Sequence, residues 1–75
     1  MALNELKERF EKNGEVRFKL FSLEYIIKKV DNNIEIYPSL YSNRKNIYST
    51  LDEALNNFTV YNESIIESID RVILL

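Results

Sequence analysis

The segment Glu15–Tyr37, EVRFKLFSLEYIIKKVDNNIEIY, gives the clearest indication of how this chain folds. Apolar and charged residues alternate along it with a period of two, a pattern typical of β-strands that bury one face. The alternation is interrupted at Phe21-Ser22 and at Asp31-Asn32-Asn33. Turns at these places divide the stretch into three strands, so the pattern predicts a three-stranded antiparallel meander.

The register of the first hairpin depends on the turn at Phe21-Ser22. A tight two-residue turn there gathers the most apolar residues of both strands on one face. The resulting pairs are Leu20 with Leu23, Phe18 with Tyr25 and Val16 with Ile27. Phe21-Ser22 lacks the glycine or asparagine that is usual in two-residue turns, so a longer loop is the alternative.

The second turn has a clearer signal, because Asp and Asn tolerate the positive φ that hairpin turns require. A turn centred on Asp31-Asn32 places Lys28 opposite Glu35, which pairs opposite charges across the strands. We expect the third strand over 33–37. Pro38 ends it, because proline cannot donate a hydrogen bond to a neighbouring strand.

Amphipathic segments on either side of the meander predict helices. Before the meander, Leu3, Leu6 and Phe10 have helical spacing, and Asn13-Gly14 ends that helix. After the meander, the run Thr50-Leu51-Asp52-Glu53 has the spacing of a capping box and begins a second helix.

A further helix is expected at the end of the sequence, with Asn62 as its N-cap. Its apolar stripe consists of Ile65, Ile66, Ile69, Val72 and Ile73. The expected architecture is therefore a single α+β domain over 1–75: an N-terminal helix, a three-stranded antiparallel β-meander, and two C-terminal helices packed on one sheet face. A chain of 75 residues is too short to bury a second independent core.

The side-chain inventory argues against catalysis. The sequence contains neither histidine nor cysteine, the commonest side chains for acid-base and covalent chemistry. Its one glycine, Gly14, cannot form a glycine-rich phosphate loop. We therefore expect a protein that is not an enzyme and has no catalytic residues, no cofactor and no metal site.

A cytoplasmic location is expected. The absence of cysteine fits a reducing compartment, and charged residues interrupt the apolar ones after Met1, unlike in a signal peptide. The apolar runs are far too short to cross a bilayer core of about 30 Å, so we expect no membrane partner. A net charge of -2 offers no overall field to attract nucleic acid.

The segment Tyr37–Tyr48 most resembles a binding surface, and its last residues, 46–48, are compatible with a short fourth strand. Aromatic rings beside adjacent cations can stack on bases or hold a phosphate. The candidate residues are Tyr37, Tyr41, Arg44, Lys45 and Tyr48. The alternative is a solvated connection whose tyrosines pack back onto the core.

A second candidate surface is the other face of the meander, where Ile26, Lys28 and Val30 lie together. Apolar residues on an exposed face often mark an interface between proteins. The alternative is that they are ordinary strand-forming residues, or that a helix covers this face too.

The leading functional hypothesis is a small protein–protein interaction module, with self-association as one form of it. A core of this size without disulfides supplies only about 3–5 kcal/mol, so a partner or a second copy would add needed stability. The alternative hypothesis is a nucleic-acid-binding accessory or regulatory protein that uses Tyr37–Tyr48.

Overall fold

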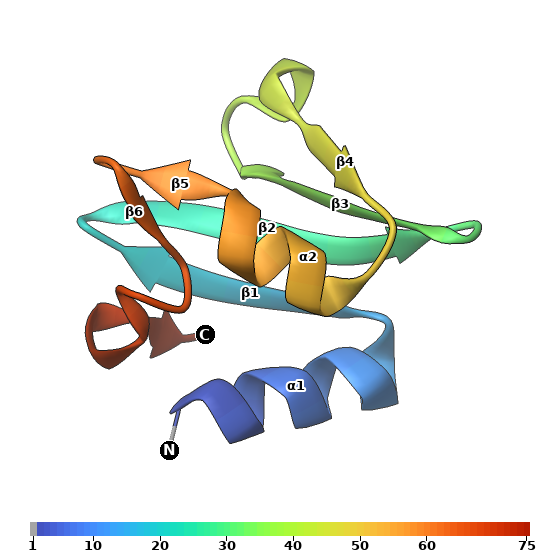
Figure 1. Cartoon of the computed structure of the whole chain (residues 1–75), viewed down its shortest axis with the longest axis horizontal. Coiled ribbons are helices and arrows are strands. Elements are labelled where there is room, and N and C mark those ends of the chain that lie inside the picture. Colours follow the sequence, from blue (N-terminus) through green and yellow to red (C-terminus); the bar gives the residue numbers. More distant parts are fainter. Residues whose placement is uncertain (1) are drawn as a thin grey trace.

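The predicted meander forms the centre of a larger antiparallel sheet. In the computed structural model, which describes residues 2–75, hairpin turns join β1 (Glu15–Leu20), β2 (Leu23–Val30) and β3 (Asn33–Pro38) (Figure 1). The short strands β4 (Asn46–Tyr48) and β7 (Ile73–Leu74) flank β3 and β1. The sheet therefore has five strands in the order β4-β3-β2-β1-β7.

The register predicted for the meander is confirmed, but the third strand is one residue longer than expected: Pro38 does not end it and lies opposite Tyr25 within β3. Across the first hairpin, Phe18 lies opposite Tyr25, and across the second, Lys28 lies opposite Glu35. The first turn contains only Phe21 and Ser22, with φ of 51° and 69°. Positive φ at both positions is what a tight turn between twisted antiparallel strands requires, so the longer loop is not needed.

The N-terminal helix is confirmed as α1 (Ala2–Asn13). Gly14 follows it with a φ of 76°, and its N–H donates to the carbonyl of Phe10 at 2.8 Å, which closes the last turn. The capping box also begins a helix, α2 (Leu51–Asn57), where the Thr50 hydroxyl accepts a hydrogen bond from the Glu53 N–H at 3.1 Å.

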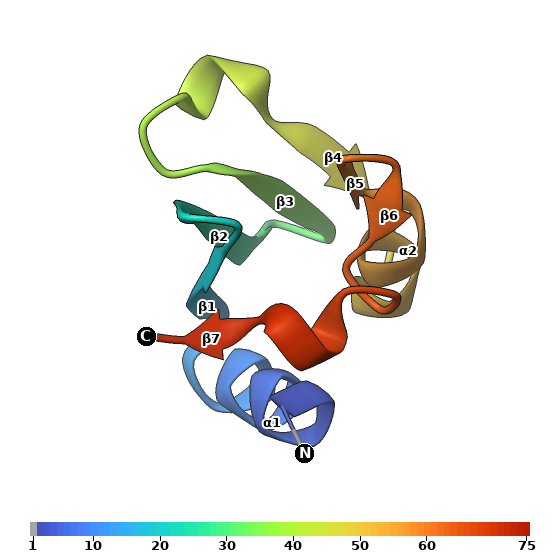
Figure 2. The same cartoon turned by 90° about the vertical axis from the view of Figure 1, so that its left-hand side faces the viewer.

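The core lies between one face of the sheet and the helices. Figure 2 shows α2 and the β5–β6 hairpin on the concave side of the curved sheet, and α1 next to β7 at the end of the sheet. The largest side chains that are fully buried in this space are Phe18, Leu6, Leu20, Ile27, Ile36, Leu55 and Ile65. Residues from nearly every element therefore share one core.

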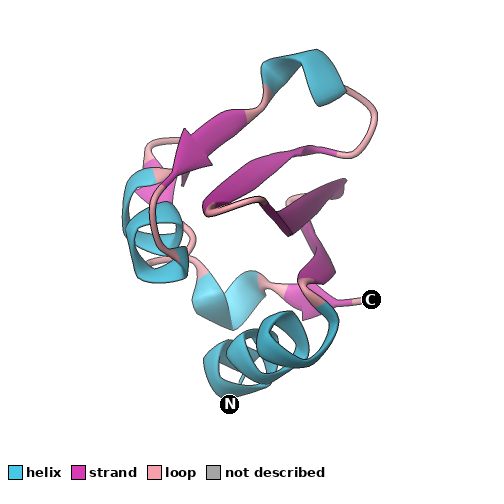
Figure 3. Cartoon of the chain, turned by 90° about the vertical axis from the view of Figure 1, so that its right-hand side faces the viewer, coloured by secondary structure: helices cyan, strands magenta, loops and turns pink. Residues whose placement is uncertain are grey.

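The expectation of two C-terminal helices packed on one sheet face is wrong. In the described residues α2 is the one α-helix after the meander (Figure 3). The chain then forms a small hairpin of β5 (Thr59–Val60) and β6 (Glu63–Ser64), a 3₁₀ turn η2 (Ile69–Arg71), and the edge strand β7.

Two competing interactions explain why the last helix does not form. Asn62 does not cap a helix, because Tyr61 and Asn62 form the hairpin turn with φ of 54° and 67°. The apolar stripe is entirely β-branched, which favours extended backbone over helix. Its end also gains a partner: Ile73 lies opposite Lys19, and β1 would otherwise be a sheet edge.

No helix within residues 2–75 combines the length and the apolar character that crossing a membrane requires.

Candidate functional site

The residues singled out in Tyr37–Tyr48 lie on two sides of the sheet. A 3₁₀ turn, η1 (Ser42–Arg44), connects β3 to β4. Tyr48 lies opposite Ile34 and packs against the core. Tyr37 lies on the outer face of the sheet, where it is 8% exposed. The structure therefore does not gather these tyrosines into one stacking surface.

The cations of this segment have nearby partners. The Lys45 ammonium lies 5.7 Å from the Tyr37 ring centroid and 3.4 Å from a carboxylate oxygen of Glu35. The Arg44 guanidinium lies 5.1 Å from the ring centroid of Tyr41, which is 46% exposed. Tyr41 and Arg44 thus form an accessible pair, whereas Lys45 is engaged by a carboxylate.

The outer face of the sheet is covered by its own charged side chains. Ile26 is 8% exposed, and Lys28 and Val30 are half-buried. Arg17, opposite Ile26, lies 3.5 Å from Glu24. The aliphatic parts of such long side chains cover neighbouring apolar surface, so Ile26, Lys28 and Val30 do not form an open apolar patch.

A cluster that the sequence did not indicate lies at the hairpin turns. Figure 1 shows the β1–β2 turn and the β5–β6 turn at the same end of the molecule. Phe21 and Tyr61 meet there edge to face, with ring centroids 5.3 Å apart. The Arg71 guanidinium lies 5.9 Å from the Phe21 ring centroid. We refer to Phe21, Tyr61 and Arg71 as the aromatic turn cluster.

Both aromatic residues of the cluster occupy strained backbone positions. Phe21 has a φ of 51° and Tyr61 a φ of 54°, a region that bulky side chains rarely adopt. Each such residue costs about 1–3 kcal/mol, and strained residues concentrate at functional sites. Phe21 recovers some of this cost by packing against the core, but Tyr61 is 74% exposed. Packing within the folded chain therefore accounts for the strained backbone of Phe21 better than for that of Tyr61.

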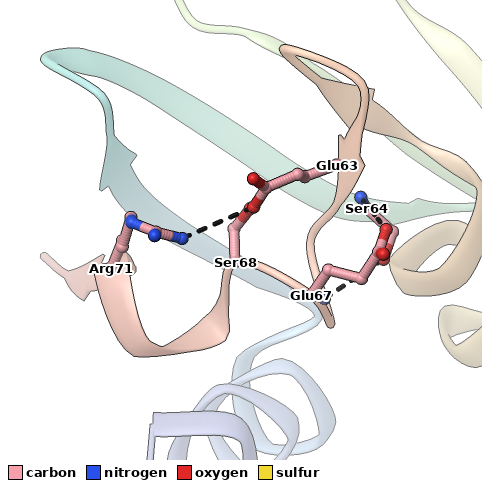
Figure 4. Close-up of polar contacts among 5 residues, drawn as sticks. All are labelled: Glu63, Ser64, Glu67, Ser68 and Arg71. Carbon is pink, nitrogen blue, oxygen red and sulfur yellow. Dashed lines mark hydrogen bonds and ion pairs between the residues drawn. The ribbon is translucent and has the colours of Figure 1, made fainter.

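A hydrogen-bonded network holds Arg71 beside Phe21. One carboxylate oxygen of Glu63 accepts from the Ser68 hydroxyl at 3.0 Å and from the Arg71 guanidinium at 3.4 Å (Figure 4). The Ser68 side chain is fully buried. Because Glu63 bridges a buried hydroxyl and an exposed cation, it anchors Arg71 to the folded chain.

Two reciprocal hydrogen bonds also hold the backbone turn that carries this network. The Ser64 N–H donates to a carboxylate oxygen of Glu67 at 2.8 Å, and the Glu67 N–H donates to the Ser64 hydroxyl at 3.1 Å. This is the geometry of a capping box, although no α-helix follows it. It fixes the turn between β6 and η2 and so the position of Arg71.

A partly apolar groove starts next to Phe21 along the chain, although none of the three residues of the cluster lines it. It begins at Ser22 and Leu23, directly after Phe21, and has a volume of about 380 Å³. Its large apolar lining residues are Leu23, Leu40, Tyr41 and Leu75, which are 39%, 81%, 46% and 56% exposed. We call this the turn groove. Only three other large apolar residues of the described chain are exposed, Ile47, Tyr61 and Ile73, so exposed apolar surface concentrates at this end.

One titratable group beneath the cluster is perturbed. Burial raises the pKa of Tyr25 above the usual 10.0, and the nearby Tyr61 hydroxyl raises it further. Tyr25 stacks on Phe18 at 5.5 Å between ring centroids and is 4% exposed. The phenol of Tyr25 therefore stays neutral at ordinary pH.

Sequence reasoning found the position of Phe21 but not its significance. The pattern located a turn at Phe21-Ser22 and noted that it lacked glycine or asparagine. An aromatic residue where a tight turn needs positive φ was the available signal. Nothing in the local sequence of Tyr61 or Arg71 indicated that both meet Phe21, because the three belong to segments distant along the chain.

In residues 2–75 no group of three or more Asp, Glu, His or Cys side chains is arranged to hold a metal ion. Comparisons of the chain with protein-family models, with curated proteins and with solved structures found no match.

Proposed function

We propose that this chain is a small non-enzymatic protein-binding module that contacts its partner through the aromatic turn cluster. The observation that carries the proposal is Tyr61, a large aromatic side chain held 74% exposed on a strained backbone. The strain destabilises the free chain, and an exposed ring returns little of it. Contact with a partner would supply the burial that the free chain lacks.

The composition of the cluster supports the same function. Tyrosine and arginine are enriched among the residues that contribute most to protein–protein affinity. Arg71 is already ordered by Glu63, so binding would immobilise few additional side-chain rotamers.

The alternative, a nucleic-acid-binding accessory protein, has narrower support. Tyr41 and Arg44 form one accessible aromatic and cationic pair. Lys45, however, is engaged by Glu35, and Tyr48 packs against the core. Binding to single strands depends on several stacking rings along a positively charged groove, and one pair is a small part of such a surface.

Photo-cross-linking tests the proposal. A photoreactive phenylalanine at position 61 keeps an aromatic ring in the cluster, and the same group at Ile47, which is 58% exposed on β4, is the matched control. In cells that make the chain, we expect a discrete cross-linked product from position 61 that is absent from position 47. Excess unlabelled wild-type chain should suppress this product, whereas excess Tyr61→Asn should not.

The mass of the cross-linked product also distinguishes self-association from binding to another protein. A product of twice the mass of the chain would identify a second copy as the partner, and a different mass would identify another protein. Equal products from both positions, or none from position 61, would contradict a binding role for the cluster.

A further inference from the structure

We infer that Asn13 is a deamidation site that the folded chain protects, so that its reaction marks chains in which the end of α1 has opened. The inference is independent of the proposed function, because it concerns the connection between α1 and β1 and not the aromatic turn cluster (Figure 1). Asn13 is the last residue of α1, and Gly14, the one glycine of the chain, follows it.

An asparagine followed by glycine is the pair in which asparagine loses its side-chain amide most readily. The backbone nitrogen of Gly14 attacks Cγ of Asn13, and the new N–Cγ bond closes a five-membered succinimide ring. The Cγ–Nδ2 bond breaks, and the Nδ2 group leaves as ammonia with the proton that the backbone nitrogen gives up. Water then opens the ring at either carbonyl, which leaves aspartate or isoaspartate. Glycine has no Cβ to obstruct the attack, and no other asparagine of this chain precedes a glycine.

In the folded chain the attacking nitrogen is engaged in a hydrogen bond. The Gly14 N–H donates to the Phe10 carbonyl at 2.8 Å, which holds the proton that the nitrogen must lose. The Gly14 carbonyl accepts from the Lys29 N–H, also at 2.8 Å, which ties the same residue to β2. Gly14 is therefore fixed on both sides, with a φ of 76°.

The backbone of Asn13 is also held away from the geometry of the ring. Ring closure requires rotation about the Cα–C bond of Asn13 until the Gly14 nitrogen lies against Cγ, and the ψ of a helical residue does not allow this approach. Asn13 is helical in the folded chain. Its side chain is exposed to water, so burial does not protect it. The protection therefore comes from the closed backbone at the end of α1.

The reaction would prevent this connection from closing again. Isoaspartate carries the main chain through its β-carbon, which inserts an extra methylene between the Cα of residue 13 and Gly14. The Gly14 N–H and carbonyl then shift relative to Phe10 and Lys29, so the two hydrogen bonds cannot both be kept. A chain that opens and reacts is therefore left less stable than before.

Mass spectrometry of the proteolytic peptide that contains Asn13 measures the reaction at mildly alkaline pH. In native buffer, deamidation should be at least about tenfold slower than in the same chain unfolded in guanidinium chloride, because only the opened fraction reacts. Ile65→Ala, which removes a core side chain outside α1, should raise the rate toward the unfolded value. Leu40→Ala, at an exposed residue, should leave the rate unchanged. Asn13→Gln should remove the product, because glutamine would have to close a six-membered ring.

Hydrogen exchange of the Gly14 amide tests the cause of the protection. Exchange and ring closure both require release of this N–H from the Phe10 carbonyl. The two rates should therefore rise together as denaturant is added below the unfolding transition. Equal deamidation in the folded and unfolded chains would overturn the inference. A deamidation rate that stays constant while Gly14 exchange accelerates, or faster reaction at another asparagine of the unfolded chain, would overturn it as well.

The isoaspartate product tests the consequence. Isolated by chromatography, it should unfold at a lower denaturant concentration than wild type. Asn13→Asp is the matched control, because it carries the same new charge on an ordinary backbone and should unfold at a higher denaturant concentration than the isoaspartate chain. Equal midpoints for the isoaspartate chain and wild type would show that reacted chains close again, and the reaction would then mark nothing in the fold.

Discussion

Phe21 and Tyr61 meet edge to face with ring centroids 5.3 Å apart, each from the first position of a two-residue hairpin turn. The φ angles are 51° and 54°, so both turns place an aromatic residue where asparagine or glycine is usual. The contact joins the central sheet to the small β5–β6 hairpin. It also creates an exposed aromatic surface that neither turn would have alone.

Tyr61→Asn should leave the free energy of unfolding of the chain about unchanged or raise it, by no more than about 2.5 kcal/mol. Relief of left-handed strain is worth about 1–3 kcal/mol, and loss of the edge-to-face pair costs about 0.5–1.5 kcal/mol. Urea unfolding followed by circular dichroism measures the change. Tyr61→Phe, which keeps both the ring and the strain, is the control and should match wild type. A loss of several kcal/mol in Tyr61→Asn would show that the ring is a structural requirement.

Ile65→Ala should largely unfold the chain. Ile65 is fully buried, and removing a buried isoleucine side chain to Cβ costs about 2–5 kcal/mol. A core of this size supplies only about 3–5 kcal/mol, so little stability would remain. Leu40→Ala, at a residue 81% exposed, should change the stability by no more than about 0.5 kcal/mol. Thermal melts of both variants make the comparison, and similar melting temperatures would contradict the packing described for Ile65.

Thr50→Ala should destabilise the fold by about 1 kcal/mol, because the Glu53 N–H loses its acceptor at 3.1 Å. Thr50→Ser retains the hydroxyl and should restore most of the loss. Hydrogen exchange of the first amides of α2 offers a local readout in both variants. Equal stability of Thr50→Ala and wild type would mean that the cap contributes nothing in this context.

The free energy of unfolding should fall above about pH 10 in a way that depends on Tyr25. Burial, with the Tyr61 hydroxyl as a second cause, raises the pKa of Tyr25 in the folded chain above 10.0. The folded state therefore holds this proton more tightly than the unfolded state. Its contribution is constant below the unfolded pKa and is lost as the pH rises through the folded pKa.

Tyr25→Phe removes this contribution, so its stability should decline less steeply between about pH 9 and pH 11 than that of wild type. Tyr41→Phe, at a half-exposed tyrosine, is the control. Urea titrations at each pH provide the free energies. Parallel curves for wild type and Tyr25→Phe would contradict the raised pKa.

The register of the meander could be predicted because its information is local, although the third strand includes Pro38, which was expected to end it. Alternation with period two fixes which residues of a strand share a face, and a shift of one residue would reverse that face. The opposite charges of Lys28 and Glu35 supported the same register. The last predicted helix failed because an apolar stripe at helical spacing does not say whether its residues will lie on a helix or on successive turns. Ile65 and Val72 of that stripe are buried without a helix.

The candidate site, like the fold, could be predicted from the sequence only in part. Local sequence pointed to the concentration of tyrosines and cations in Tyr37–Tyr48, but it could not show that Tyr48 faces the core and Tyr37 the outer face. The position of Arg71 beside Phe21 depends on Glu63 and Ser68, which the tertiary fold brings together. The short-period patterns that predict strands and helices cannot indicate such a contact.

The α1 helix, the three central strands and the register of these strands follow from the amino-acid sequence alone, because spacing, turn residues and capping act between near neighbours along the chain. The course of residues 59–75 and the surface at the hairpin turns depend instead on contacts between segments that are distant along the chain. There, β7 completes the edge of β1, and Tyr61 and Arg71 are placed against Phe21. Such long-range contacts compete with local helix propensity, which for a β-branched segment is weak enough to be overridden.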